Sequence, residues 1–176
     1  MKRAVLSFIA AMLIAGTVTA AFGYRGREFL TEEEIEAIRR NQKIDPRVKL
    51  YLRAALLRLT SARARIAGQE TEPGDPLEYL TPEDMLDGYY RILNSVMLNL
   101  EDAGQKIPPD RGGIRKALKH LRDQMKKAIP TLELMEKIAA EKNETELTRL
   151  IRRAADISNG ALEGAEYGLS DKFSEY

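Results

Sequence analysis

Histidine is the side chain best suited to acid–base or metal chemistry, and His120 is the only histidine among 176 residues. A di-iron site in a helical bundle needs two Glu-x-x-His motifs and two further inward glutamates. His120 lies two residues after Leu118, which the apolar spacing places in the core, so we expect the imidazole on the outer face. Met125 and Met135 fall at core spacing, where packing explains them without haem ligation. The sequence therefore predicts no metal site and no cofactor.

Two other patterns could carry catalysis. Asp84 and Asp87 lie in a predicted first helical turn, where the helix dipole stabilises negative charge and no catalytic role is needed. Arg111-Gly112-Gly113 precedes a helix but lacks the rest of a phosphate-binding loop. No serine lies near His120 on its helix face, so a Ser/His/acid arrangement is excluded. We therefore expect no catalytic residues and a protein that is not an enzyme.

The chain contains no cysteine. Disulfide bonds, cysteine-ligated zinc, cysteine nucleophiles and thioether-linked haem are excluded on that ground, as is the acylated cysteine of a bacterial lipoprotein. Small exported proteins often depend on disulfides. This one must be stabilised by its hydrophobic core.

The first 23 residues have the layout of a secretory signal peptide. Met1-Lys2-Arg3 gives a positive start, an apolar run follows from Ala4 to Val18, and small residues offer cleavage after Ala20 or Gly23. The alternative is an uncleaved anchor, but the run is shorter than the about 20 apolar residues of a spanning helix. We expect an exported protein, periplasmic or secreted, with no membrane span after cleavage.

Removal of residues 1–23 takes Lys2 and Arg3 from 28 basic residues and nothing from 27 acidic ones, which leaves a formal charge of −1. Such a balance gives no reason to expect a nucleic-acid partner. The remaining length is that of one domain able to bury a sizeable core. We expect a helical bundle domain over residues 24–169 and a polar tail over 170–176.

Four segments repeat an apolar residue at alternating three- and four-residue steps, and none has the two-residue period of a strand. These apolar rows are Val48, Leu52, Ala55, Leu59, Ala62, Ile66; Leu86, Tyr89, Leu93, Val96, Leu100, Ala103; Ile114, Leu118, Leu121, Met125, Ala128, Leu132, Met135, Ala139; and Leu147, Leu150, Ala154, Ile157, Ala161. A 3.5-residue period is typical of helices that pack at about +20° with interlocking side chains. The sequence predicts an all-α protein.

Capping signals agree with these rows. Thr31 with Glu34 forms a capping box, which predicts a short first helix over residues 31–42. The other predicted helix ends are Asp45-Pro46 and Gly68 for the second helix, Thr81-Pro82-Glu83-Asp84 and Gly104 for the third, and Asn143 with Glu146 for the last.

Pro130 falls inside the third apolar row, whose phase continues unbroken from Met125 to Leu132, so we expect one kinked helix there. The connections over residues 69–80 and 105–113 are short enough for antiparallel neighbours. The sequence predicts an up-down-up-down four-helix bundle with a short extra N-terminal helix lying across it.

A basic face is expected on the third long helix. It consists of Arg111, Arg115, Lys116, Lys119, Arg122, Lys126 and Lys127. The core positions of this helix lie elsewhere, so these charges point outward and suit an anionic surface. The alternative is a solvated face whose charge is answered by acids at residues 32–36 and 70–87.

A glycine stripe, Gly160, Gly164 and Gly168, recurs every four residues in the last helix. Each glycine inside a helix costs up to about 1 kcal/mol, so three in register need a reason. One is the close approach of another helix or a partner, and the other is a fraying terminus before the tail.

Three segments, Gly74 to Tyr90, Leu30 to Ile35 and Asn159 to Glu166, resemble a family of exported bacterial helical-bundle proteins to which no activity is assigned. The resemblance implies a bacterial, exported protein. We expect a non-enzymatic interaction or structural protein of the cell envelope, with a protein or envelope component as its partner. The alternatives are a small-ligand carrier with a pocket beside the glycine stripe, and an anionic-surface binder that uses the basic face.

Overall fold

Five α-helices make up the part of the computed structural model that is described, residues 29–170, and no strand occurs within it. They are α1 (Glu32–Arg40), α2 (Ile44–Ile66), α3 (Pro82–Gln105), α4 (Arg111–Glu141) and α5 (Thr145–Leu169). The predicted all-α class is confirmed. The expected signal peptide, residues 1–23, and all but the first residue of the expected tail lie outside the described residues.

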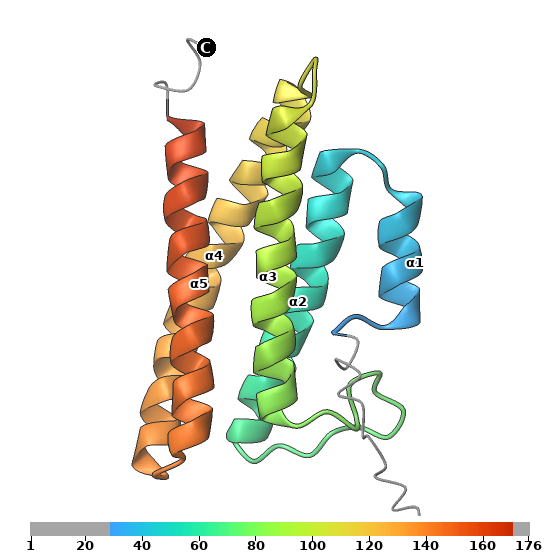
Figure 1. Ribbon diagram of the computed structural model, residues 1–176. Coiled ribbons are helices and arrows are strands. Elements are labelled where there is room, and N and C mark those ends of the chain that lie inside the picture. Colours follow the sequence, from blue (N-terminus) through green and yellow to red (C-terminus); the bar gives the residue numbers. More distant parts are fainter. Residues whose placement is uncertain (1–28, 171–176) are drawn as a thin grey trace, which may run out of the picture.

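The four long helices alternate in direction along the chain and form two hairpins, α2 with α3 and α4 with α5 (Figure 1). Between the hairpins, α2 packs against α4 and α3 packs against α5. The α3–α4 connection departs from the expectation of antiparallel neighbours, because these two helices touch at few positions. A Cβ on Gly113 would lie 2.9 Å from the Cγ2 atom of Ile44, so the first turn of α4 lies against α2 instead.

Helix α1 runs alongside α2 and not across the bundle (Figure 1). Its capping box is present: Glu34 N–H donates to Thr31 Oγ1 at 3.2 Å, and Thr31 N–H donates to Glu34 Oε2 at 2.8 Å. The start of α3 has the same arrangement between Thr81 and Asp84, with Pro82 in the first helical position. Both predicted helix starts are confirmed, because capping pairs of this kind act within one turn.

Two predicted caps are wrong. Helix α2 begins at Ile44, and Asp45 lies inside its first turn, where the carboxylate accepts from Lys49 Nζ at 3.0 Å. Asn143 does not begin α5 but follows the end of α4 with a φ of 59°, and its N–H donates to Ala140 O. Asparagine tolerates this left-handed conformation, which lets it take the place that glycine usually occupies after a helix.

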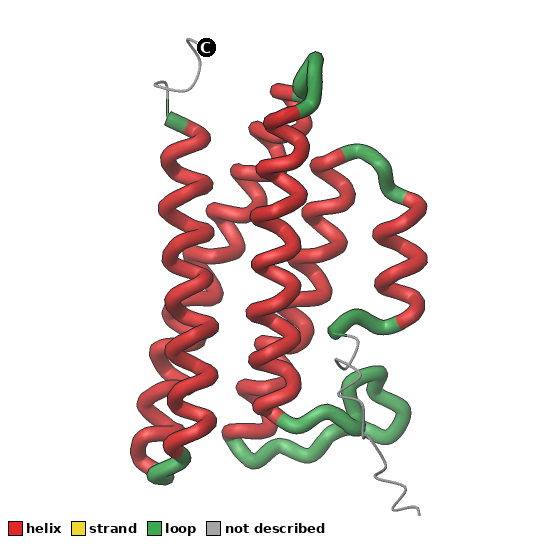
Figure 2. The backbone as a smooth tube through the Cα atoms, in the orientation of Figure 1, coloured by secondary structure: helices red, strands yellow, loops and turns green. Residues whose placement is uncertain are grey.

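The connection between α2 and α3 is the longest loop within the bundle (Figure 2). Gly68, with a φ of 82°, ends α2 as predicted. The side chain of Leu77 is buried in the core, and Arg65 donates to the backbone carbonyls of Leu77, Glu78 and Leu80. A single arginine of α2 therefore satisfies three loop carbonyls and fixes the entry into α3.

The predicted apolar rows form the core. All their residues are buried except Leu100, Ile114 and Leu118, which are partly buried and pack against the core. Helix α4 runs unbroken through Pro130, as predicted, with Ala128 and Leu132 buried on either side of it.

One polar group lies at the centre of this core. Tyr89 is fully buried, and its hydroxyl lies 2.7 Å from Ser158 Oγ, which in turn donates to Ala154 O at 2.7 Å. Burial raises the pKa of Tyr89 to about 12, although the hydrogen bond to Ser158 acts in the opposite direction.

A buried ion pair holds α1 against α2. Arg58 is only 2% exposed, and its Nη1 and Nη2 donate to Glu34 Oε1 and Oε2 at 2.9 and 2.8 Å. The same guanidinium donates to Ala54 O at 2.9 Å. Gly88 of α3 makes room for it, since a Cβ there would lie 3.1 Å from Arg58 Cδ. The capping carboxylate of α1 is thus also the counter-ion of a buried cation.

Replacing Glu34 with alanine should lower the free energy of unfolding by about 3 kcal/mol or more, because it leaves Arg58 buried without its counter-ion. Glu36→Ala is the matched control, since Glu36 pairs only with the exposed Arg39 and Arg40 and its loss should cost no more than about 0.5 kcal/mol. Urea unfolding followed by circular dichroism measures both. Equal midpoints for the two variants would show that the buried pair does not stabilise the protein.

The stability of the protein should fall as pH rises from about 10 to about 12. An unfolded tyrosine ionises near pH 10, whereas the pKa of Tyr89 in the folded protein is about 12. Between these pH values deprotonation stabilises the unfolded state relative to the folded state. The loss amounts to about 3 kcal/mol. Tyr89→Phe removes this dependence, so the wild type and the variant should converge in stability as pH rises. Parallel pH profiles for the two proteins would contradict the assignment.

Candidate functional site

The basic face lies on the outer side of the first half of α4. Arg115, Lys119, Arg122 and Lys126 follow steps of four, three and four residues and so share one stripe of the helix. Lys116 and Lys127 lie beside that stripe. All six are exposed apart from the partly buried Arg122, whereas the opposite side of α4 is in the core. These residues therefore point outward, as predicted.

Few of these charges are neutralised within residues 29–170. Lys126 Nζ lies 2.9 Å from Glu166 Oε1, and Arg122 Nη2 lies 2.8 Å from Asp123 Oδ1. Arg122 lowers the pKa of the Asp123 carboxyl through this hydrogen bond, and Lys126 and His120 add to the effect. Among described residues no ion pair is formed by Arg115, Lys116, Lys119 and Lys127.

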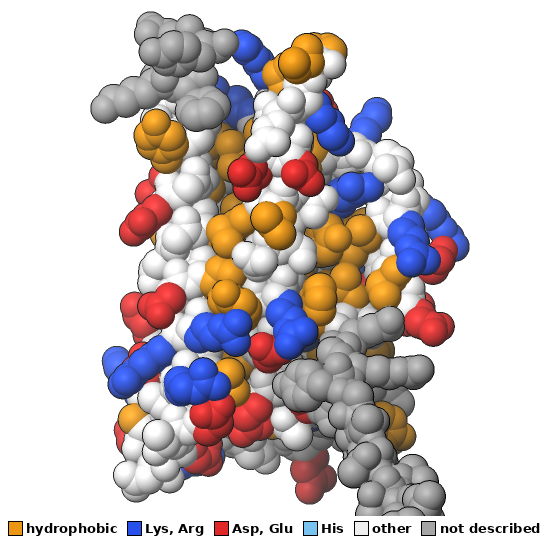
Figure 3. Space-filling model, in the orientation of Figure 1, with side chains coloured by type: hydrophobic (Ala, Val, Ile, Leu, Met, Phe, Trp, Pro, Cys, Tyr) orange, Lys and Arg blue, Asp and Glu red, His pale blue; other side chains and the backbone are white. Residues whose placement is uncertain are grey.

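Three of the acids that could have answered this face, Glu34, Glu36 and Asp87, have partners elsewhere. Glu34 pairs with Arg58, and Glu36 with Arg39 and Arg40. Asp87 pairs with Arg91 and with Arg153, whose guanidinium lies 3.7 Å from the ring centre of Tyr90. Figure 3 shows basic, acidic and apolar side chains close together over the lower parts of α3 and α5. The basic face therefore keeps an excess of positive charge.

His120 lies at the edge of the basic face. Its side chain is 43% exposed, and Nε2 lies 3.7 Å from Asp45 Oδ1 of α2. That oxygen is buried and has no hydrogen-bond partner in the described structure. Within residues 29–170 no group of three or more His, Asp or Glu side chains is placed to hold a metal ion.

The glycine stripe does not receive another helix. Gly160 and Gly164 are exposed, and a Cβ on either would meet no atom within 4 Å. Gly168 differs, since a Cβ there would lie 2.9 Å from Leu118 Cδ1 of α4. Only the last of the three glycines therefore permits a close contact inside the bundle. The pockets described for this structure are lined by other residues.

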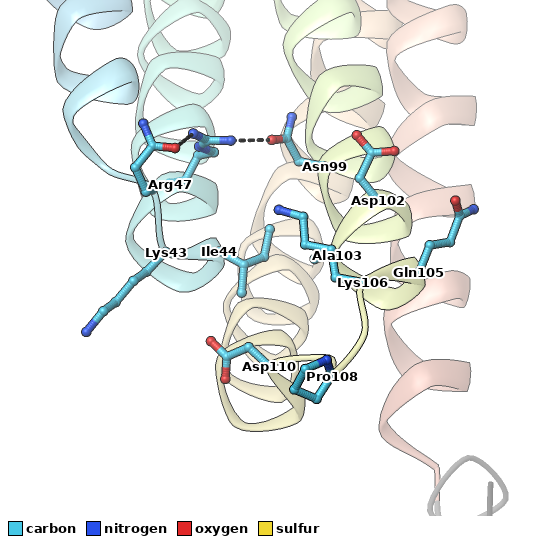
Figure 4. Close-up of a pocket in the computed structure, with 11 residues that line it drawn as sticks. Lys43, Ile44, Arg47, Asn99, Asp102, Ala103, Gln105, Lys106, Pro108 and Asp110 are labelled. Atoms are coloured by element: carbon cyan, nitrogen blue, oxygen red, sulfur yellow. Dashed lines mark hydrogen bonds between the residues drawn. The ribbon is translucent and has the colours of Figure 1, made fainter.

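A pocket of about 530 Å³ opens at one end of the bundle, and we call it the end pocket (Figure 4). It lies where the α1–α2 turn, the last turns of α3 and the start of α4 meet. Its lining residues are Gln42, Lys43, Ile44, Arg47, Asn99, Asp102, Ala103, Gln105, Lys106, Pro108 and Asp110. This pocket was not predictable from the sequence, because its walls come from segments more than fifty residues apart.

Arg47 is fixed in the wall of the end pocket. Its Nε donates to Asn41 O at 2.9 Å, and Nη2 donates to Gln42 Oε1 at 3.0 Å. Nη1 donates to Asn99 Oδ1 at 3.4 Å, a bond drawn in Figure 4. These bonds join the α1–α2 turn to α3 and hold the guanidinium in one orientation. The pocket thus has a preorganised cation on one side.

Lys106 behaves differently. Its ammonium group points into the space between α2 and α3 (Figure 4). Neither Lys106 nor Asp102, one helical turn before it, has a hydrogen bond or ion pair with a residue that the structure describes. Asp110 already uses one carboxylate oxygen, since its Oδ1 accepts a hydrogen bond from Gly113 N–H at 2.9 Å and caps α4. Charges of both signs therefore line this pocket.

Two other pockets have simpler linings. One of about 640 Å³ lies between α1 and α2 and is largely apolar, with Leu50, Leu56 and Leu57 among its residues. The other, of about 700 Å³, lies along the first half of α5, and most of its lining residues are polar or charged, among them Arg149, Arg152 and Asp156. None of the helices described is both long and apolar enough to cross a membrane.

Comparison of the chain with protein-family models, with curated proteins and with solved structures finds no match. The resemblance in residues 74–90 to exported bacterial bundle proteins therefore stays an expectation.

Proposed function

We propose that this protein is a non-enzymatic interaction protein of the bacterial cell envelope, exported by a signal peptide over residues 1–23, and that it binds an anionic surface through the basic face of α4. The observation that carries the proposal is the set of four exposed cations, Arg115, Lys116, Lys119 and Lys127, without an ion pair among the described residues. Of the three functions expected from the sequence, this one has the most support in the geometry.

The shape of the basic face suits a flat partner. Residues 115 to 127 span about 18 Å of helix at 1.5 Å per residue. Because the Debye length is about 10 Å at 0.1 M salt, each charge reinforces its nearest neighbours on the face and not those at the far end. Basic residues close to an anionic lipid surface contribute about 1 kcal/mol each. Four unpaired cations are enough for reversible, salt-sensitive binding.

The carrier alternative beside the glycine stripe has weaker support. Open space lies over Gly160 and Gly164, and the described pockets are lined elsewhere. An exposed stripe of this kind does not enclose a ligand.

The purified protein should bind vesicles of equal parts phosphatidylglycerol and phosphatidylcholine, and not vesicles of phosphatidylcholine alone. Raising the salt from 0.05 to about 0.5 M should release it, because the Debye length shortens. Co-sedimentation measures the bound fraction. Reversing two charges with Lys116→Glu and Lys119→Glu should lower the partition coefficient by at least about tenfold.

A matched control separates the face from the total charge. Arg63→Glu with Lys137→Glu changes the net charge by the same amount at exposed positions outside the basic face. This control should bind like the wild type. Equal losses in the two double variants would mean that only net charge matters. Binding that salt does not weaken would end the proposal.

Export has its own test. Expressed in a bacterium with its full N-terminus, the protein should appear outside the cytoplasm, beginning at Ala21 or Tyr24 after removal of the positively charged start and the apolar run. Fractionation and intact-mass measurement read both outcomes. An intact Met1 in a membrane fraction would favour a retained anchor, and an intact Met1 in the cytoplasm would contradict export.

A further inference from the structure

We infer that the end pocket binds a small zwitterion, a molecule with a carboxylate, an ammonium group and a compact apolar part, as in a neutral amino acid. This inference is independent of the basic face. It rests on three features of the pocket: uncommitted charges of both signs, an apolar floor and a volume suited to a small ligand.

The uncommitted charges are the first feature. Lys106 and Asp102 stand four residues apart on α3, the spacing at which opposite charges commonly pair on a helix. No ion pair joins them, and the Lys106 ammonium points toward the α2 side of the pocket (Figure 4). Figure 4 shows the Asp102 carboxylate pointing away from the Lys106 ammonium, so the two charges stay separate and each can meet the opposite pole of a ligand.

The guanidinium of Arg47 strengthens the site for a carboxylate. Its bonds to Asn41, Gln42 and Asn99 fix its position before any ligand arrives. A preorganised cation loses less conformational entropy on binding than a free one. Together with Lys106 it forms the cationic side of the pocket.

The apolar floor is the second feature. Ile44 and Ala103 are 8% and 7% exposed, and Pro108 also lines the pocket. On its α4 side Ile44 faces Gly113, where an added Cβ would lie 2.9 Å from Ile44 Cγ2. The volume of about 530 Å³ falls within the range of about 300–1,000 Å³ typical of small-molecule sites.

A simple anion fits less well. The start of α4 would attract phosphate through its free N–H groups, but the Asp110 carboxylate already accepts from Gly113 N–H at that position. Asp102 adds a second negative charge to the lining. A simple amine is opposed in turn by Arg47, Lys43 and Lys106. A ligand that carries both charges satisfies both sides of the pocket.

Three probes of similar shape test the inference on the full ¹⁵N-labelled chain by nuclear magnetic resonance. They are leucine, 4-methylpentanoate, which lacks the amine, and 3-methylbutylamine, which lacks the carboxylate. Leucine should shift the amide signals of residues 42–47 and 99–106 and bind at least about tenfold more tightly than either analogue, since each lost charged contact is worth about that factor.

Two variants and a control locate the binding. Lys106→Gln should weaken leucine binding about tenfold, and Ala103→Leu should abolish it by filling the floor. Lys137→Gln, an exposed site on α4, should change nothing. Should Ala103→Leu unfold the chain, Lys106→Gln still decides the matter, because that side chain is exposed.

Three results would overturn the inference. One is a leucine affinity equal to that of its analogues. If 4-methylpentanoate bound as tightly as leucine, the pocket would be a site for a simple anion. Another is leucine binding that Lys106→Gln leaves intact. The third is the absence of any shift in residues 42–47 and 99–106 at about 10 mM leucine, a concentration that would reveal even weak binding. Vesicle binding by the basic face is measured separately and is unaffected by any of these results.

Discussion

The packing of α4 against α2 determines the layout of the molecule. Because Gly113 has no side chain, the first turn of α4 reaches Ile44 of α2, and α4 lies diagonally across the bundle from α3. The short connection from α3 must then cross the end of the bundle, and it forms a wall of the end pocket as it does so. The same packing turns the basic half of α4 outward. One contact between two helix starts thus places both candidate sites.

Two polar interactions inside the protein act as constraints on how the helices fit together. The Tyr89 hydroxyl joins α3 to α5 through Ser158, and Arg58 joins α2 to α1 through Glu34. Each buried group would be costly without its partner, so alternative packings of these apolar rows are disfavoured. In a chain without disulfides, such pairs supply geometric definition that apolar contacts alone do not provide.

The sequence predicted features that depend on neighbours within a few residues. The apolar rows identified the core, and Thr31 and Thr81 marked two helix starts, because capping acts inside one turn. The helix caps predicted at Asp45 and Asn143 were wrong because each residue has another local role. Asp45 pairs with Lys49, and Asn143 adopts a left-handed turn after α4. The basic face was predictable from helical spacing. The lack of ion pairs at four of its cations was not, because it depends on which acids the fold brings near them. The end pocket and the Arg58–Glu34 pair were missed, since both depend on tertiary contacts between distant segments.

The ion pair between α1 and α2 also bears on the order in which the chain becomes ordered. With nine residues, α1 is shorter than the about 12–15 residues that an isolated helix needs to be stable in water. The counter-ion of Glu34 follows 24 positions later, so a growing chain presents the sequence of α1 well before the arginine that fixes it. Helix α1 therefore consolidates only after α2 has been synthesised.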